Sequence, residues 1–273
     1  MDHIELKGAR LPRIGFGTSG LSGEACTRMV RTALDLGYRH IDTAQAYGNE
    51  AAIGTALRGT AVDRADIFVT TKVWRSEMRD GALQRSADES LRKLKTGYVD
   101  LLLIHWPNDT VPMGETLRAL TAVRAAGKAR FIGVSNFTLH HLDEAVGTHH
   151  ADLLCNQVEC HAMMRQERLR AALARHGMAL TAYSPLGRGL LTREPALAAI
   201  GRKHGKSGPQ VALRWLMQQD GIVAIPKAGS EAHARANLEI FDFALDAEDM
   251  AAIDALPAHE RVIDPGWGPA WDD

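Results

Sequence analysis

The sequence is poor in cysteine and carries almost no net charge. Its three cysteines, Cys26, Cys155 and Cys160, are an odd number without Cys-x-x-Cys spacing. They therefore indicate neither a disulfide framework nor a zinc site, and we expect reduced thiols. Lys plus Arg total 32 and Asp plus Glu total 33. This balance favours neither nucleic acid nor an anionic membrane surface as a partner.

Long apolar runs are also absent. No stretch approaches the ~20 apolar residues that would span a bilayer, and the N-terminus lacks the basic and then apolar pattern of a secretory signal. We therefore expect a cytoplasmic protein. No low-complexity segment or linker marks a boundary, so residues 1–273 are predicted to form a single domain. That length is sufficient to bury a substantial core.

Apolar runs alternate with helical patterns along most of the chain. Runs typical of buried strands occur at residues 14–18, 39–41, 67–69, 99–104, 131–134, 153–154, 178–182 and 222–225. Helical spacing occurs at residues 24–36, 50–58, 79–94, 113–126, 139–146, 166–176 and 196–218, the last interrupted at Gly208 and Pro209. Strands that are continuously apolar and alternate with helices predict a parallel sheet covered by helices. Eight such units predict an α/β fold, a (β/α)8 TIM barrel.

Two segments lie outside this repeating pattern. Residues 4–6 and 11–14 are expected to form a small N-terminal hairpin that turns at Lys7 and Gly8. After Leu256 the chain is rich in proline, glycine and tryptophan. This composition suits a C-terminal tail over the barrel mouth, or a terminus that is simply strapped to the surface.

Ionisable residues stand where three of the predicted strands end. Asp42 and, five residues later, Tyr47 follow the second strand, Lys72 follows the third and His105 follows the fourth. The carboxyl ends of parallel strands meet at one edge, so we expect these four side chains to share the barrel mouth. Singly, each has an ordinary alternative as a cap, a surface charge or a packed core residue. Their joint placement predicts an active site.

A second interpretation of the N-terminal region is a dinucleotide-binding Rossmann fingerprint. Gly15, Gly17 and Gly20 form Gly-x-Gly-x-x-Gly after a strand, and Asp42 follows about 20 residues later. In that fold, however, the third glycine lies in the first turn of the helix, whereas Ser22 and Gly23 still intervene here before the helical pattern begins. The fingerprint also leaves Tyr47, Lys72 and His105 without a role.

Seven segments carry a resemblance to a known family. They are GYRHIDTAQAYGNE at residues 37–50, TTKVW at 70–74, LLLIHWP at 101–107, GVSNF at 133–137, NQVE at 156–159, AYSPLG at 182–187 and IPKAGS at 225–230. Through these segments, in this order, the chain resembles the aldo-keto reductases along nearly its whole length. Its tail, with an Arg-Val pair, a proline and a late tryptophan within residues 261–271, is similar to that of the bacterial 2,5-diketo-D-gluconate reductases of B type.

This resemblance implies NADPH-dependent reduction of aldehydes and ketones to alcohols, including small dicarbonyls such as methylglyoxal and keto-sugar acids such as 2,5-diketo-D-gluconate. Hydride addition leaves an alkoxide that needs an acid, and the resemblance makes Tyr47 that proton donor. A phenol has a pKa of about 10, and a cation ~4 Å away could lower it by up to about three units. Lys72 would supply this cation, Asp42 would keep it charged, and a neutral His105 would orient the carbonyl.

The resemblance also implies NADPH as cofactor. Ser135, Asn136 and Gln157 would hold the nicotinamide amide, and Tyr183 would stack on the ring. The full set of expected cofactor residues is Gly17, Thr18, Ser135, Asn136, Gln157, Tyr183, Ser184, Leu186, Gly187, Lys227, Ala228, Gly229, His233, Arg235 and Asn237.

The chain departs from the family pattern at the adenosine end. Ala228 stands in place of a usual serine and His233 in place of a usual arginine. Arg235 could compensate, because a guanidinium binds phosphate bidentately. We therefore expect a preference for NADPH over NADH that is weaker than is typical of the family.

Substrate recognition is expected to rest on Trp74, Trp106 and Trp267. The pairs His140–His141 and His149–His150 lie in or beside the fifth helical pattern, away from the barrel mouth. They are expected at the surface rather than as ligands, and no metal site is predicted. The resemblance further suggests a monomer.

Two other functions stay open at this point. One is a Schiff-base lyase with Lys72 as nucleophile, which would need a neutral lysine that the adjacent Asp42 opposes. The other is a nucleotide-sensing barrel that binds the cofactor without turnover and serves a partner protein.

Overall fold

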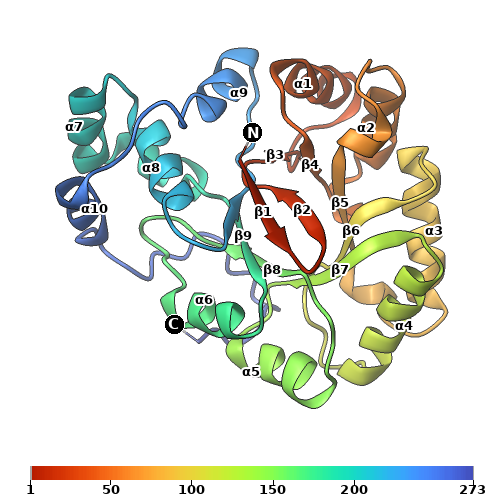
Figure 1. The fold of residues 1–273 in the computed structure, drawn as a ribbon. Helices are drawn as coiled ribbons and strands as arrows, with labels where there is room; N and C mark the ends of the chain where they lie inside the picture. Colours follow the sequence, from red (N-terminus) through yellow and green to blue (C-terminus); the bar gives the residue numbers. More distant parts are fainter. Residues whose placement is uncertain (1, 273) are drawn as a thin grey trace.

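Eight parallel strands follow one another around the sheet in the order of the sequence (Figure 1). A computed structural model describes residues 2–272. The strands are β3 (Phe16–Gly17), β4 (His40–Asp42), β5 (Phe68–Val73), β6 (Val99–Ile104), β7 (Ala129–Ser135), β8 (Cys155–Glu159), β9 (Ala179–Tyr183) and β10 (Ile222–Ala224). Each neighbouring pair is parallel. This order agrees with the alternation predicted from the sequence.

The first and last strands of the sheet also meet, which closes the barrel. Parallel bridges join Ile14 to Ala224 and Gly17 to Lys227, and the Gly15 N–H donates to the Ala224 carbonyl at 2.8 Å. A Cβ at Gly17 would lie 2.6 Å from the carbonyl oxygen of Ile225. Closure therefore requires a glycine at this position. The predicted TIM barrel is confirmed, and the Rossmann interpretation of these glycines is wrong.

A two-stranded hairpin lies across the barrel in Figure 1. Strands β1 (His3–Leu6) and β2 (Ala9–Pro12) pair antiparallel around a turn at Lys7 and Gly8, both with positive φ. Leu11 packs into a cluster with Phe68, Leu101 and Leu103 from the barrel strands. The predicted hairpin is confirmed, and it contributes apolar side chains to the barrel's own core.

Helices cover the outside of the sheet (Figure 1). They are α1 (Gly23–Leu36), α2 (Glu50–Arg58), α3 (Ala82–Leu94), α4 (Met113–Ala125), α5 (Leu139–Leu142), α6 (Glu167–Arg175), α7 (Pro195–His204), α8 (Gly208–Met217), α9 (Glu231–Leu238) and α10 (Ala247–Asp254). Short 3-10 helices span Gln45–Tyr47, Arg64–Asp66, Arg75–Glu77 and Gly187–Arg193, and a π-helix spans Asp143–Thr148. The predicted interruption of the helix at residues 196–218 exists, but it falls at residues 205–207, and Gly208 and Pro209 form the first turn of α8.

The position of one strand was wrongly predicted. The apolar pair at residues 153–154 precedes β8, which spans Cys155–Glu159. Asn156, Gln157 and Glu159 are each at most 2% exposed and each is hydrogen-bonded inside the protein. Hydropathy therefore does not mark this strand, and Gln157 lies in its middle rather than at its end.

Candidate active site

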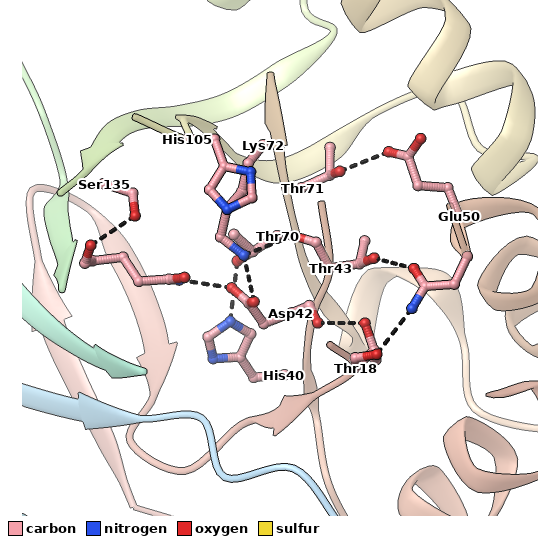
Figure 2. Close-up of polar contacts among 12 residues, drawn as sticks. Thr18, His40, Asp42, Thr43, Glu50, Thr70, Thr71, Lys72, His105 and Ser135 are labelled. Atoms are coloured by element: carbon pink, nitrogen blue, oxygen red, sulfur yellow. Dashed lines mark hydrogen bonds and ion pairs between the residues drawn. The ribbon is translucent and has the colours of Figure 1, made fainter. Parts of the chain in front are cut away.

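Four ionisable side chains gather at the carboxyl edge of the barrel, as the spacing predicted. Asp42 is the last residue of β4, Lys72 lies one residue before the end of β5, and His105 follows β6 directly. Tyr47 ends the 3-10 helix that follows β4. Figure 2 shows Lys72 between His105 and Asp42. All four side chains line or adjoin one cavity of about 890 Å³, of which Asp42, Tyr47 and His105 form part of the wall.

Two oxygen atoms hold the Lys72 ammonium. Its Nζ lies 2.5 Å from Asp42 Oδ1 and 2.8 Å from the Thr43 carbonyl oxygen. Lys72 is completely buried. Burial acts to lower the pKa of this ammonium, but Asp42 and Tyr47 outweigh burial and raise the pKa above its ordinary value. Lys72 is therefore charged at neutral pH.

Asp42 has a second partner that the sequence did not indicate. Gln157 Nε2 donates to Asp42 Oδ2 at 2.7 Å, across 115 residues of sequence. Both carboxylate oxygens are thus hydrogen-bonded although Asp42 is only 1% exposed. Lys72 and Gln157 therefore fix the position of both carboxylate oxygens.

The Tyr47 phenol contacts both neighbours at the base of the cavity. Lys72 Nζ lies 5.2 Å from the centroid of its ring, and the His105 ring stands edge-on at 5.6 Å between centroids. Burial raises the pKa of the phenol, and the Lys72 charge opposes burial without reversing it. The net lowering of the Tyr47 pKa that we expected from the sequence is therefore wrong. Tyr47 stays protonated at neutral pH and so remains a hydrogen-bond donor.

His105 is neutral for two reasons. Burial and then the Lys72 charge hold the pKa of its imidazole well below the ordinary value of 6.5. Within residues 2–272 no side chain or backbone group bonds its buried Nδ1. A neutral imidazole with a nitrogen not engaged by the protein can donate or accept one hydrogen bond to a molecule in the cavity.

The same cavity extends away from these four side chains along the carboxyl ends of the strands. Eight predicted cofactor residues line it, namely Gly17, Thr18, Asn136, Gln157, Tyr183, Ser184, Leu186 and Lys227. Asn136 and Ser184 adopt positive φ, which is unusual for residues with a side chain. Tyr183 donates from its hydroxyl to Asn136 Oδ1 at 2.8 Å. The Tyr183 ring at the cavity wall is therefore held in place by a hydrogen bond.

Three tryptophans and the C-terminal tail form the opposite wall. The Trp74 ring lies 5.2 Å from that of His105 and 5.6 Å from that of Trp267, and Trp267 lies 5.2 Å from Trp106. The tail residues Val262, Ile263, Asp264, Pro265 and Trp267 line the cavity. The sequence left two roles open for the tail, as a cover for the pocket and as a strapped terminus. The structure combines them, because the tail is held by hydrogen bonds and also forms a wall.

Comparison with known proteins identifies the family. Residues 13–258 match the aldo/keto reductase family. The chain belongs to this family.

Individual aldo/keto reductases are similar over nearly their whole length. The methylglyoxal reductase DkgB of Escherichia coli O157:H7 is 39% identical over 266 residues, which are 96% of this chain and 99% of that protein. The glyoxal reductase of Bacillus subtilis strain 168 is 41% identical over 263 residues, 96% of this chain and 95% of that protein. As a member of this family, the chain is an oxidoreductase.

Solved structures show the same fold. A protein provisionally named 2,5-diketo-D-gluconic acid reductase B has 46% identity and a TM-score of 0.96, covering 100% of this chain and 98% of its own. A mutant of Gox0644 in complex with NADPH has 33% identity and a TM-score of 0.89, and the match covers 95% of this chain and 94% of that one.

The remaining predicted cofactor residues of this aldo/keto reductase do not line the cavity. They are Ser135, Gly187, Ala228, Gly229, His233, Arg235 and Asn237. Ser135 donates its hydroxyl to the Gln157 carbonyl at 2.7 Å. Arg235, expected to supply a phosphate contact, forms an ion pair with Glu231 at 2.9 Å on the exposed face of α9. A phosphate would therefore compete with a carboxylate for this guanidinium.

Three features outside the cavity complete the comparison with the sequence. The surface location predicted for the two histidine pairs is wrong for His141, which is buried and whose Nδ1 lies 2.8 Å from the Thr138 hydroxyl. His149 of the second pair is exposed and lies 3.6 Å from Glu144. Cys26, Cys155 and Cys160 are buried free thiols. In the part of the chain that the structure describes, no helix is both long and apolar enough to cross a membrane.

One buried histidine of this aldo/keto reductase makes its stability depend on pH. His40, 1% exposed, lies two residues before Asp42 with Nε2 3.0 Å from the Thr70 hydroxyl. Burial lowers its pKa from 6.5 to about 4, with Asp42 acting in the opposite direction. As the pH falls from 6.5 towards 4, the unfolded chain binds a proton that native His40 does not, so stability is lost.

We expect this histidine to contribute a loss of roughly 3 kcal/mol in the free energy of unfolding over that range. Urea unfolding at several pH values checks it. His40→Gln keeps a polar group for Thr70 but has no proton to gain, so it should lose about 2 kcal/mol less stability than the wild type between about pH 7 and 4.5. Parallel pH dependences of the two proteins would contradict the assignment.

Proposed function

We propose that the chain catalyses the NADPH-dependent reduction of small aldehydes, ketones and dicarbonyls to alcohols, with Tyr47 as the proton donor. The observation that carries this proposal is the arrangement at the cavity base. A protonated phenol and a neutral imidazole adjoin one cavity, with the charged Lys72–Asp42 pair behind the phenol. Relatives named methylglyoxal and glyoxal reductases support the reaction class.

The cavity suits a nicotinamide nucleotide. Gly17 presents backbone without a side chain, Tyr183 presents an aromatic ring, and Arg188 and Lys227 line the cavity as cations. Arg188 and Gly189 have positive, non-helical φ angles at a kink within residues 187–193, and both residues line the cavity. NADPH would supply a hydride to the carbonyl carbon when bound there. A solved relative in complex with NADPH supports this choice of cofactor.

Each of the four side chains has a distinct task in the proposed reaction. Tyr47 gives its phenolic proton to the carbonyl oxygen as negative charge develops there. The Lys72 charge stabilises the phenolate that remains, and Asp42 holds Lys72 in place and charged. His105, neutral, donates a second hydrogen bond that orients the carbonyl oxygen towards Tyr47.

The substrate wall favours small uncharged carbonyl compounds. Trp74, Trp106 and Trp267 give it an aromatic lining. Asp264 also lines the cavity, with Oδ1 2.8 Å from the Trp271 indole nitrogen. A carboxylate at this wall opposes an anionic substrate. We therefore place dicarbonyls such as methylglyoxal ahead of keto-sugar acids such as 2,5-diketo-D-gluconate.

The two alternative functions are less well supported. A Schiff-base lyase needs a neutral lysine, whereas the pKa of Lys72 is raised and Asp42 contacts its ammonium. A nucleotide sensor would not need the phenol, imidazole and ion pair to share one cavity base. The cytoplasmic location, the monomeric state and the single domain remain predictions of the sequence.

Absorbance assays of nucleotide oxidation test the proposal. The panel contains methylglyoxal, an aromatic aldehyde and 2,5-diketo-D-gluconate, each with NADPH and with NADH. We expect turnover with NADPH, the highest kcat/KM for methylglyoxal, and a preference over NADH that is modest, about tenfold, because Arg235 is paired with Glu231. Nucleotide binding without oxidation by any carbonyl would favour the sensor. Equal efficiency with NADPH and NADH would refute the cofactor assignment alone.

A further inference from the structure

A completely buried carboxylate, Glu159, ends β8. It plays no part in the proposed reaction. Alternate residues of a strand share a face, so Glu159 lies on the same face of β8 as Gln157, one step nearer the barrel mouth. Gln157 holds Asp42. The neighbouring position on this face therefore carries a second buried polar group with a separate set of partners.

Three hydrogen bonds converge on the Glu159 carboxylate. The Val262 N–H donates to Oε1 and the Ile263 N–H donates to Oε2, each at 2.8 Å. His161 Nε2 lies 3.0 Å from Oε1. The Met163 N–H donates to His161 Nδ1, which leaves the ring hydrogen of a neutral imidazole on Nε2, so His161 also donates to Glu159. Both carboxylate oxygens are thus occupied, two of the donors being consecutive amides of the tail.

These two amides begin the segment that forms the substrate wall. Residues 262–265 and Trp267 line the cavity. From residue 255 to residue 272 the chain has neither α-helix nor strand, so its path depends on contacts with the barrel. Trp267 itself is 46% exposed. Its ring contacts Trp74, Trp106 and the Arg75 guanidinium, and its carbonyl receives a long bond of 3.4 Å from Arg75. Within residues 2–272, the backbone hydrogen bonds to the barrel that lie nearest to Trp267 on its N-terminal side are those from the Val262 and Ile263 amides to Glu159.

We propose that Glu159 is a positioning residue that fixes the tail over the carbonyl half of the cavity and so limits the size of the carbonyl compound that binds well. The kinetic part of this proposal rests on the proposed function; the structural part does not. The charge of Glu159 strengthens both amide bonds. Strand β8 thereby anchors two walls of one cavity, through Gln157 to Asp42 and through Glu159 to residues 262 and 263.

Glu159→Gln tests this role. The carboxamide has one acceptor oxygen and an amino group, so it cannot accept from all three donors. We expect amide hydrogen exchange at Val262 and Ile263 to accelerate about tenfold or more. KM for an aromatic aldehyde should change about threefold to tenfold, whereas kcat for methylglyoxal should stay within about twofold, because the phenol and its partners are untouched.

Two further variants keep the test decisive. Trp267→Ala removes the ring but leaves both amides on Glu159, so KM should change while exchange at Val262 and Ile263 does not. Val262→Pro removes one donor from the tail side and leaves the Ile263 amide as the exchange readout. Exchange at Ile263 should accelerate and KM for the aromatic aldehyde should change as in Glu159→Gln, even if the latter variant fails to fold.

Three results would overturn the proposal. They are unchanged exchange in Glu159→Gln, faster exchange with every KM unchanged, and an equal fall in kcat for all carbonyls at constant KM. The second would make Glu159 merely structural, and the third would place its effect on the reacting groups. If the wild-type protein reduced no carbonyl compound, the proposed function would be wrong. The exchange data would still decide whether Glu159 holds the tail.

Discussion

Tyr47→Phe is expected to lower kcat for carbonyl reduction by about 10²–10⁴, the usual contribution of a general acid, while the fold and nucleotide affinity stay close to those of the wild type. The ring keeps its edge-on contact with His105, and only the hydroxyl is lost. Neither of the two neighbouring ionisable groups, Lys72 and His105, can readily replace the phenol as proton donor. Lys72 is held by Asp42 and Thr43, and His105 is neutral with a low pKa.

The measurement is steady-state oxidation of NADPH with methylglyoxal, together with NADPH binding followed by fluorescence. Tyr98→Phe is a matched control, because Tyr98 precedes β6 at the opposite end of the barrel and stacks under Arg64 with its ring, 4.3 Å from the guanidinium carbon. It should keep near-full turnover. If Tyr47→Phe also kept it, Tyr47 would not be the proton donor.

The placement of these side chains was predictable from the sequence for a simple reason. The runs at residues 39–41, 67–69 and 99–104 overlap β4, β5 and β6, and consecutive parallel strands place their carboxyl ends at one edge. Asp42, Lys72 and His105 therefore had to share that edge once the sheet was parallel. The outcome needed no knowledge of side-chain contacts.

Features that depend on distant neighbours were not predictable in this way. The bond from Gln157 to Asp42 spans 115 residues. The position of β8 was wrongly predicted because its polar side chains are satisfied by partners elsewhere in the chain. Helices α9 and α10 were not predicted, since each buries only two residues, one of them polar. The tail follows no periodic pattern, because it is held by residues that are distant in the sequence, such as Glu159 and Leu139.

The pKa of Tyr47 shows a different limit. The sequence motifs predict that the Lys72 charge lies near the Tyr47 phenol. This charge acts to lower the pKa of the phenol, as expected. Burial has the opposite effect and is larger. The degree of burial depends on the packing of Trp74, His105 and the tail around the cavity, which the sequence alone does not give.

Lys72→Met is expected to damage both stability and turnover. Methionine resembles the lysine stem in shape but leaves Asp42, 1% exposed, without its cation. Breaking a buried ion pair in this way costs about 3–5 kcal/mol. The Asp42 charge, now unopposed, would raise the pKa of Tyr47 further, so we expect kcat to fall by at least about 10². Urea unfolding and methylglyoxal reduction measure the two effects separately.

The double variant Asp42→Asn with Lys72→Met separates the two causes. It removes both charges, while an asparagine oxygen can still accept from Gln157 Nε2. Stability should recover by about 2 kcal/mol or more relative to Lys72→Met, because no uncompensated buried charge remains. Turnover should stay far below that of the wild type, because nothing stabilises the phenolate of Tyr47. A double variant that regained turnover along with stability would show that Lys72 serves the fold, and that the phenol needs no cation to give up its proton.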